Sequence, residues 1–397
     1  MRALLVTSAE KGHLNPVVGV AQWLQELGHH VGWLTLPDPS PQLEAIGVEP
    51  VRAPGLPPAP PLTTGGEALA RLVTRPDALR GWIRTLLIEA VPAQVEPVGR
   101  AIAAFRPDVI ALDGMLYQAV IAAHRAGVPY AGISSALTLL EPPELDTELL
   151  RTVRGLAGER ASLFARFGME PAFRTCECLS PSLNVVFATP AFVGEGSRVP
   201  PNTRLVGPSA PLRSRGDETD FPWDRLPADR PLVYASFGSQ IYWQPELLQT
   251  IAVAAADLGV GLAISAGELA DTGFGDRLPG CPVVRRYVPQ LAVLERAAVL
   301  VTHGGANSVM ESLRCGVPQL LVPICNDQFV QAFFAERAGT GIAVSPAELS
   351  RERCRESLAA LLDAEGPQRR AARRVAEHYA HRDGAREAAE AIAALAG

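Results

Sequence analysis

The sequence has a single lysine, Lys11, although it contains 36 Lys and Arg residues in total. This scarcity excludes several enzyme classes. A P-loop needs Gly-Lys-Ser/Thr, but Lys11 is followed by Gly12-His13, so the chain has no P-loop. A pyridoxal-phosphate Schiff base could form only at Lys11. No complete G-x-G-x-x-G is present, so a nicotinamide-binding Rossmann site has no fingerprint, and the absence of G-x-S-x-G weakens the case for a serine hydrolase.

The chain also lacks an excess of basic residues. Asp and Glu number 42 against 36 Lys and Arg, which gives a net charge of -6. Nucleic-acid-binding surfaces and polybasic membrane patches need the opposite balance, so we expect no nucleic-acid partner and no stable membrane insertion. The longest near-apolar window, residues 247–267, is interrupted by Asp257 and Gly259, and it predicts a buried helix followed by a strand.

Cysteine and metal-ligand patterns are sparse. The six cysteines are irregularly spaced and the N-terminal residues have a strand pattern rather than a secretory one, which predicts a reduced, cytoplasmic protein. Cys176-Glu177-Cys178 is a lone C-x-C with no second pair, and no D-x-D is present. We therefore expect no metal site.

Apolar residues make up 48% of the sequence and charged residues 20%, which is typical of a globular chain, and the length predicts two domains or more. Strand-like and helix-like segments alternate, and this rhythm predicts parallel sheets covered by helices on both faces. The rhythm breaks over 208–230 and then restarts. We predict two doubly wound α/β domains, at 1–207 and 231–375, joined by a linker at 208–230. A final helix within 376–397 is a candidate to cross back to the first domain.

The first candidate site is the run from Lys11 to Pro16, where the first strand ends and the first helix begins. Loops at the carboxyl ends of parallel strands line the ligand crevice, so His13 is predicted there, with an imidazole able to take a proton near pH 7. Asp113 follows the strand 108–112 and is predicted on the same rim. A carboxylate beside an imidazole fixes its tautomer and stabilises its cation. The alternatives are a hydrogen-bonded surface histidine and an aspartate that caps the helix near Tyr117.

The second candidate site is the run from His303 to Glu311, which joins a buried strand to a helix. Gly304 and Gly305 let backbone N–H groups approach an anion, and the helix start adds partial positive charge. With the Ser308 hydroxyl, this pattern predicts a phosphate site. Glu311 lies one turn further on and could accept hydrogen bonds from ribose hydroxyls. The alternative is a glycine turn that serves only strand-to-helix packing.

Two further loops follow strands of the second domain. Asp327 and Gln328 place a carboxylate beside an amide, which suits the recognition of sugar hydroxyls. The alternative for Asp327 is a helix cap. Ser239 lies in a small-residue loop predicted to border the same crevice, and an ordinary turn is the alternative there.

Together these residues resemble the family 1 glycosyltransferases, nucleotide-sugar-dependent enzymes of the GT-B fold. The resemblance is strongest over 287–328, where it includes Tyr287-Val288-Pro289-Gln290 and the run from His303 to Glu311, and weakest over 54–181. The segment Gly12-His13-x-Asn15-Pro16 is similar to the catalytic-histidine loop of bacterial members, including macrolide and carotenoid glycosyltransferases.

The resemblance implies a fold and a set of roles. The fold is GT-B, with two Rossmann-like domains that face a deep cleft. His13 is the implied general base, and Asp113 is its orienting partner. The implied donor-binding residues, which include a base-stacking aromatic, diphosphate contacts, a ribose carboxylate and sugar-hydroxyl contacts, are Ser239, Tyr287, Val288, Gln290, His303, Gly305, Asn307, Ser308, Glu311, Asp327 and Gln328.

The implied activity is an inverting, metal-independent transfer of a hexose from a nucleotide diphosphate sugar to a hydroxyl of an apolar small molecule, as in bacterial secondary metabolism. No cofactor is expected, because the nucleotide sugar is a co-substrate. Glu311 favours UDP over dTDP, since it needs a ribose 2′-hydroxyl. A dTDP-deoxysugar transferase, a nucleotide-sugar epimerase or hydrolase, and a non-catalytic helper protein are the alternatives. The largely apolar segments 54–87 and 137–178 are predicted to line the acceptor site. The pattern leaves the oligomeric state open.

Overall fold

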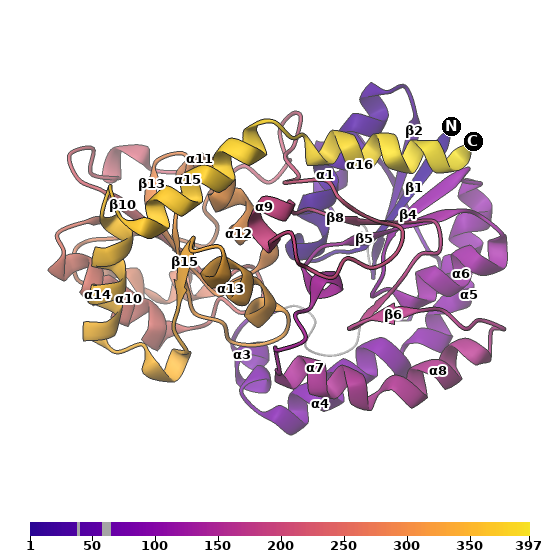
Figure 1. Cartoon of the computed structure of the whole chain (residues 1–397), viewed down its shortest axis with the longest axis horizontal. Helices are drawn as coiled ribbons and strands as arrows, with labels where there is room; N and C mark the ends of the chain where they lie inside the picture. The colour runs from indigo at the N-terminus through magenta and orange to yellow at the C-terminus, as the bar shows by residue number, and fades with distance from the viewer. Residues whose placement is uncertain (38–39, 58–64) are drawn as a thin grey trace.

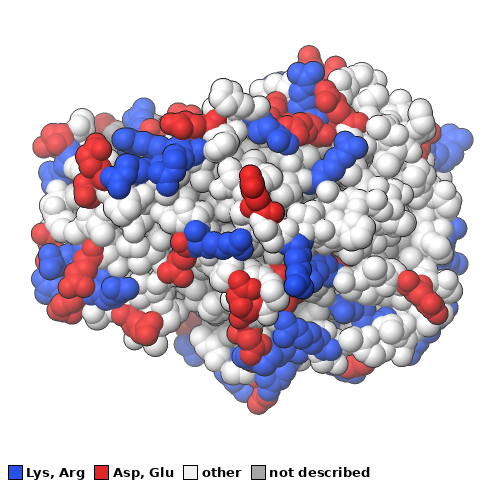
Figure 2. Space-filling view, viewed as in Figure 1, with Lys and Arg blue, Asp and Glu red and all other residues white. Residues whose placement is uncertain are grey.

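A computed structural model describes residues 1–37, 40–57 and 65–397. It shows two α/β halves side by side, with the N-terminal half in indigo and magenta and the C-terminal half in orange and yellow (Figure 1). Residues 58–64 belong to a stretch predicted to be a loop and to line the acceptor site, and they lie outside the described residues. No described helix is long and apolar enough to cross a membrane. On the face drawn in Figure 2, acidic and basic side chains are interspersed.

The N-terminal half is built on a sheet in which every pairing is parallel. Within the described residues it has seven strands in the order β3-β2-β1-β4-β5-β8-β9. The strands are β1 (Arg2–Ser8), β2 (His30–Leu36), β3 (Glu49–Val51), β4 (Val109–Asp113), β5 (Tyr130–Ser134), β8 (Leu183–Val186) and β9 (Thr203–Leu205). A short antiparallel pair lies outside it, formed by β6 (Phe173–Arg174) and β7 (Glu177–Cys178).

Helices cover both faces of this sheet, because alternate residues of each strand point to opposite sides. On β1, Leu4 belongs to one buried cluster and Leu5 to the other. The helices of this half are α1 (Lys11–Glu26), α2 (Gln42–Ala45), α3 (Glu67–Val73), α4 (Pro76–Arg84), the π-helix η1 (Thr85–Glu89), α5 (Val91–Phe105), α6 (Tyr117–Ala126), η2 (Thr138–Leu140), α7 (Glu148–Gly155), α8 (Ala157–Ala165) and α9 (Pro190–Val193).

The C-terminal half repeats the plan with a second, wholly parallel sheet. Its six described strands run in the order β12-β11-β10-β13-β14-β15. They are β10 (Leu232–Ser236), β11 (Gly261–Ser265), β12 (Val283–Arg285), β13 (Ala297–Thr302), β14 (Gln319–Leu321) and β15 (Gly341–Ala343). The prediction of parallel-sheet α/β architecture is therefore confirmed. The segment 208–230 between the sheets holds only the short turn η3 (Trp223–Arg225).

Helices also flank the second sheet, namely α10 (Pro245–Asp257), η4 (Gly267–Thr272), η5 (Gly275–Arg277), α11 (Gln290–Leu294), α12 (Ala306–Arg314), α13 (Gln328–Arg337), η6 (Pro346–Glu348), α14 (Arg351–Leu362) and α15 (Pro367–Ala380). Two helical segments follow them in the chain, α16 (Gly384–Ala393) and η7 (Ala394–Ala396). The last of the long helices, α16, lies on the N-terminal half, where both chain ends meet (Figure 1). Its Ala385 and Ile392 are fully buried in the cluster that also contains α1.

An apolar cluster joins the two halves. It combines residues of η2, β8 and α9 with residues of α12, α13 and α15. Phe192 of α9 and Phe334 of α13 are both fully buried, and their ring centroids lie 6.4 Å apart. The halves are therefore packed directly together on this side, and the 208–230 segment is not their only connection.

Candidate active site

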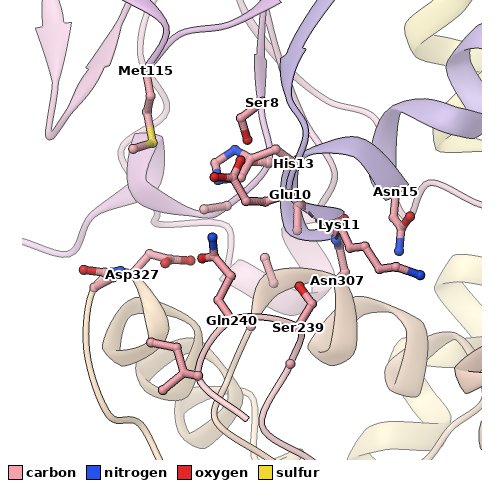
Figure 3. Close-up of a pocket in the computed structure, with 18 of the residues that line it drawn as sticks. Ser8, Glu10, Lys11, His13, Asn15, Met115, Ser239, Gln240, Asn307 and Asp327 are labelled. Carbon is pink, nitrogen blue, oxygen red and sulfur yellow. Dashed lines mark hydrogen bonds between the residues drawn. The ribbon is translucent and has the colours of Figure 1, made fainter. Parts of the chain in front are cut away.

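Both halves contribute to one cavity of about 630 Å³, which lies beyond the carboxyl ends of the central strands. This volume is within the range of roughly 300–1,000 Å³ that is usual for small-molecule sites. Figure 3 shows Ser8, Glu10 and His13 on the N-terminal side and Ser239, Gln240 and Asp327 on the C-terminal side.

The first turn of α1 carries His13 into this cavity. The sequence predicts a helix from Leu14, with Pro16 in its first turn, but α1 begins at Lys11, so Pro16 lies further inside the helix. Proline has no backbone N–H, so the carbonyl four residues before it has no partner within the helix. That carbonyl belongs to Gly12, and it accepts a hydrogen bond from Asn307 Nδ2 at 2.9 Å. Pro16 thus frees an acceptor that ties the two halves together across the cleft.

His13 and Asp113 form a hydrogen-bonded pair. Asp113 is the last residue of β4, which neighbours β1, and its side chain is buried. Its Oδ2 lies 2.5 Å from His13 Nδ1, and its Oδ1 accepts from the backbone N–H of Met115 at 2.9 Å. The Ser135 hydroxyl also lies 2.9 Å from Nδ1. These contacts fix the orientation of the imidazole, and its Nε2 makes no hydrogen bond within the described part of the chain.

The electrostatics of this pair favour the imidazolium. Burial lowers the pKa of His13, but the charge of Asp113 and its hydrogen bond, with smaller contributions from Glu10 and Asp327, together raise it to about 9. At pH 7 the free imidazole is therefore mostly protonated. His13 can act as a base only in its neutral form, which is the minor form at this pH.

A second buried carboxylate, Glu177 of β7, lies behind the pair. Its Oε1 accepts hydrogen bonds from Ser134 and Thr138. Burial and the nearby charge of Asp113 raise the pKa of Glu177 to about 8, although both hydroxyls and His13 oppose the shift. In the sequence, Glu177 stands out only as the middle residue of a C-x-C. Its place next to the catalytic candidates arises from the β6–β7 hairpin, which the sequence analysis did not predict.

In the C-terminal half, His303 follows β13 and packs between two glycine-containing turns. A Cβ on Gly238 would lie 2.7 Å from the imidazole, and a Cβ on Gly305 would also lie 2.7 Å from it, so neither position can carry a side chain while the ring stays in place. Gly304 adopts φ 89°, which lets the chain turn from the strand into α12. Burial lowers the pKa of His303 to about 4. His303 is therefore neutral at pH 7 and can donate a hydrogen bond but supplies no charge.

Glu311 is held by other side chains. Its Oε1 accepts from Arg215 Nη1 at 2.8 Å, and its Oε2 accepts from Gln290 Nε2 at 2.7 Å. Gln290 Nε2 also lies 3.3 Å from the Ser308 hydroxyl. Arg215 comes from the 208–230 segment and is almost fully buried. The predicted ribose-binding carboxylate is thus already ion-paired. Its partner Arg215 was not among the residues predicted from the sequence.

The ring of Tyr287 is also covered by the chain itself. The ammonium of Lys11 lies 3.6 Å from the ring centroid and 3.0 Å from Asp217 Oδ2. The Tyr287 hydroxyl donates to the same Asp217 oxygen, and Arg215 contacts both Tyr287 and Asp217. Burial lowers the pKa of Lys11, and the charge of Asp217 opposes this shift. A cluster of Lys11, Arg215, Asp217, Tyr287 and Glu311 therefore occupies the predicted nucleoside site.

Asp327 and Gln328 border the cavity, and their side chains also form hydrogen bonds within the chain segment that borders it. The side-chain amide oxygen of Gln328 accepts from the backbone N–H groups of Ile324 and Cys325, and the Asp327 carboxylate accepts from the side chain of Gln331. Burial raises the pKa of Asp327, against the opposing charge of His13. Among the described residues, no group of three or more His, Cys, Asp or Glu side chains is placed to hold a metal ion.

The N-terminal wall of the cavity is largely apolar. Residues from α4, η1 and the loop after β4 form it, namely Trp82, Ile83, Leu86, Leu87, Ala90, Met115 and Leu116. Four buried polar atoms of the lining have no hydrogen-bond partner within the described residues, namely Ser8 Oγ, Glu10 Oε2, Trp82 Nε1 and Asn326 Oδ1. Buried polar atoms without partners are rare in folded proteins, and a bound ligand or water is one way to satisfy them.

The structure gathers most of the predicted site around this cavity. The residues that line it are His13, Asp113, Ser239, Tyr287, Gln290, His303, Gly305, Asn307, Ser308, Asp327 and Gln328. Two predicted residues do not line it. Val288 is fully buried in the core, and Glu311 lies behind its partners Arg215 and Gln290.

Comparisons with known proteins identify glycosyltransferases as relatives of this chain. Residues 247–395 match the C-terminal domain of the erythromycin biosynthesis protein CIII-like family. The chain is 25% identical to the NDP-glycosyltransferase YjiC of Bacillus subtilis, over 88% of this chain and 86% of that protein. It is 27% identical to the oleandomycin glycosyltransferase of Streptomyces antibioticus, over 97% and 89% of the two chains.

The fold is shared with solved structures. The crystal structure of the glycotransferase of kitacinnamycin superposes with a TM-score of 0.76 at 22% identity and covers 100% of this chain and 99% of that one. The fold and these relatives define the protein as a glycosyltransferase of the GT-B class. The C-terminal family match and these relatives support a family 1 natural-product glycosyltransferase.

Proposed function

We propose that this enzyme transfers a hexose from a nucleotide diphosphate sugar to a hydroxyl of an apolar small molecule, with inversion at the anomeric carbon and without a metal. The observation that carries the proposal is the position of the His13–Asp113 pair, which shares one cavity with the strand-to-helix turn at His303. A proton acceptor and an anion-binding helix start then face each other across the space where sugar transfer would occur.

His13 is the proposed base. Its neutral form takes the proton from the acceptor hydroxyl while that oxygen attacks the anomeric carbon from the face opposite the diphosphate. Asp113 keeps Nδ1 protonated and stabilises the imidazolium that forms. The leaving diphosphate is stabilised by the start of α12 and by hydrogen bonds from His303, Asn307 and Ser308.

The acceptor is proposed to lie against the apolar wall. Trp82 Nε1, which has no hydrogen-bond partner in the described chain, would donate to an oxygen of the acceptor. The oleandomycin enzyme's name supports an acceptor of the macrolide or related antibiotic type. All six cysteines are free, which supports a cytoplasmic location.

UDP-sugar is the proposed donor, because Glu311 suits a ribose diol. The second candidate is a dTDP-deoxysugar, and a specific observation favours it: both carboxylate oxygens of Glu311 already have partners. A nucleotide without a 2′-hydroxyl would not need to displace them.

A screen tests the proposal. Hydrophobic hydroxylated acceptors are incubated with UDP-glucose or dTDP-glucose, and products are detected by mass. Acceptor-dependent glycoside formation is expected. Release of free sugar without any acceptor would instead indicate a hydrolase, and nucleotide-sugar binding without turnover of any acceptor would indicate a helper protein. The anomeric configuration of the product, read by NMR, tests inversion.

A further inference from the structure

The proposed diphosphate site contains little full positive charge. A nucleoside diphosphate sugar carries two negative charges on its phosphates. Asn307 and Ser308 are uncharged, and His303 is neutral because burial lowers its pKa to about 4. The start of α12 contributes about half a unit charge. The predicted contacts alone therefore leave much of the diphosphate charge unbalanced.

The other cations of the cavity wall are already committed. Arg215 is buried and ion-paired with Asp217 and Glu311. Arg286 is paired with Glu268 and Asp271. His13 is held by Asp113 and is assigned to proton transfer. Lys11 is also paired, with Asp217, but that carboxylate has a second cationic partner in Arg215, and the stem of Lys11 has four flexible carbons.

Lys11 also lies close to the phosphate side of the cleft. Its backbone carbonyl is 3.5 Å from Asn307 Nδ2, so its main chain lies directly opposite the start of α12. Figure 3 shows Lys11 beside Asn307, on the opposite side of the cleft from Ser239. Only the side chain is turned away, along the cleft toward Tyr287 and Asp217. Rotation about its stem can bring the ammonium to the phosphate position without movement of the backbone.

The nucleobase and the ammonium compete for one place. The proposed function stacks the base on Tyr287, and Lys11 Nζ now covers a face of that ring at 3.6 Å. A base that occupies this face displaces the ammonium at the moment when two phosphate charges arrive nearby. Loss of the contact with Asp217 is then offset by a contact with the diphosphate, which is the more highly charged partner.

We propose that Lys11 is a mobile donor-binding residue: in the empty cleft its ammonium covers Tyr287 and pairs with Asp217, and in the complex it pairs with the donor diphosphate at the start of α12. This assignment rests on the proposed function. It supplies the positive charge that other nucleotide-sugar sites obtain from a divalent cation, and it gives a role to the single lysine of the chain.

Calorimetry with UDP and with uridine separates this role from a structural one. Lys11→Met should weaken UDP binding by about 10–150-fold, the value for loss of a hydrogen bond between charged groups. The same variant should bind uridine as well as the wild type does, or more tightly, because the base no longer competes with the ammonium. Lys11→Arg should retain most of the UDP affinity. Equal losses for UDP and uridine would show a structural role and overturn the assignment.

Because the chain has one lysine, the motion can be observed directly. Reductive methylation with ¹³C-formaldehyde labels only Lys11 and the N-terminal amine, and the Lys11→Met variant identifies the N-terminal signal. UDP should move the Lys11 resonance away from its ring-shifted position over Tyr287. A resonance that does not move at saturating UDP overturns the proposal. Failure of the wild type to bind either UDP or dTDP would overturn the proposed function as well, whereas UDP binding that Lys11→Met leaves unchanged overturns the Lys11 assignment alone.

Discussion

The two walls of the cleft are built on the same α/β plan but differ in chemistry. The C-terminal wall is polar, and its contacts come from one compact stretch, 287–328, together with the turn at Ser239. The N-terminal wall is mostly apolar, and its residues come from α4, η1 and loops spread along the first half of the chain. The first turn of α1 and the end of β4 bring the proposed catalytic pair to that side.

This difference shows how the two halves divide recognition. A nucleotide diphosphate presents fixed charges and hydrogen-bonding edges, so its site needs particular residues at particular spacings. An apolar acceptor needs mainly shape and area, which many apolar side chains can supply equally well. We therefore expect substitutions in the polar wall to act through individual groups, and those in the apolar wall to act through volume.

Removal of His13 from the N-terminal wall should have the largest effect on turnover. His13→Ala should lower kcat by about 10²–10⁴-fold, because the only proposed base is lost, while UDP affinity stays near that of the wild type. Steady-state kinetics and calorimetry measure the two effects. His124→Ala, an exposed histidine in the last turn of α6, is the control. Near-normal turnover of a folded His13→Ala enzyme would remove this residue from the mechanism.

Asp113→Asn should also slow turnover, but it should do so less in a His13→Ala background, because the pair acts as one unit.

The pH dependence of turnover should be the next largest effect. The pKa of His13 is raised to about 9, so the neutral form is scarce at pH 7 and increases as the pH rises. We expect kcat/KM to rise by about 50-fold between pH 7 and pH 9, because the neutral fraction of a group with a pKa of about 9 rises from about one hundredth to one half over this range. In Asp113→Asn this rise in kcat/KM should occur at lower pH, since the negative charge that raises the pKa of His13 is gone. A rise at the same pH as in the wild type would show that another group controls the pH dependence.

The same shift predicts a stability effect with a defined sign. A histidine whose pKa is raised on folding stabilises the folded state in its protonated form. This contribution is complete below the ordinary histidine pKa of 6.5 and is lost as the pH rises through about 9. The difference in melting temperature between wild type and His13→Ala should therefore shrink from pH 6 to pH 9.5.

Nucleotide choice tests the polar wall alone. If a ribose displaces Arg215 from Glu311, UDP should bind about 10–150-fold more tightly than dTDP, and Glu311→Gln should narrow that gap. If Arg215 stays in place, the two nucleotides should bind equally to both proteins. Calorimetry gives the ratio, and Glu295→Gln, an exposed neighbour at the end of α11, is the control. The melting temperature should be checked, because Glu311→Gln weakens a buried ion pair.

The smallest expected effect is that of chelation. We expect EDTA to leave transfer unchanged, since helix α12 and side chains are proposed to balance the diphosphate. Complete loss of activity that magnesium or manganese restores would contradict both the proposed phosphate site and the comparison drawn from it.

The sequence predicted the strand and helix order well, because each element has its own hydrophobic period. The segments 117–126 and 130–134 match α6 and β5 at both ends. The three-residue strands β9 and β15 were not predicted. The start of α1 was placed too late, at Leu14, because Gly12 permits a tight turn and Pro16 suits the first turn of a helix, whereas the helix already begins at Lys11.

The candidate site was predictable where chemistry is concentrated in one run of residues. His303, Asn307 and Ser308 were found because strand, glycines and helix follow one another within a few positions. The partners Arg215 and Asp217 were missed, because they lie in a segment without periodicity and at least 70 residues away from Tyr287 and Glu311. Glu177 was missed because nothing local indicates that its hairpin folds under β4.

The return of α16 to the N-terminal half limits how this enzyme can be recombined with its relatives. A Cβ on Gly384 would lie 2.3 Å from the carbonyl oxygen of Gly207, and a Cβ on Gly19 would lie 2.8 Å from the Cβ of Ala385. The backbones therefore meet too closely for side chains, and the fit depends on both ends of the chain. A chimera with a single crossover near residue 207 would join an α1 from one parent to an α16 from the other. A second crossover before residue 384 keeps these helices together, so the donor half is exchanged as an insert rather than as a C-terminal module.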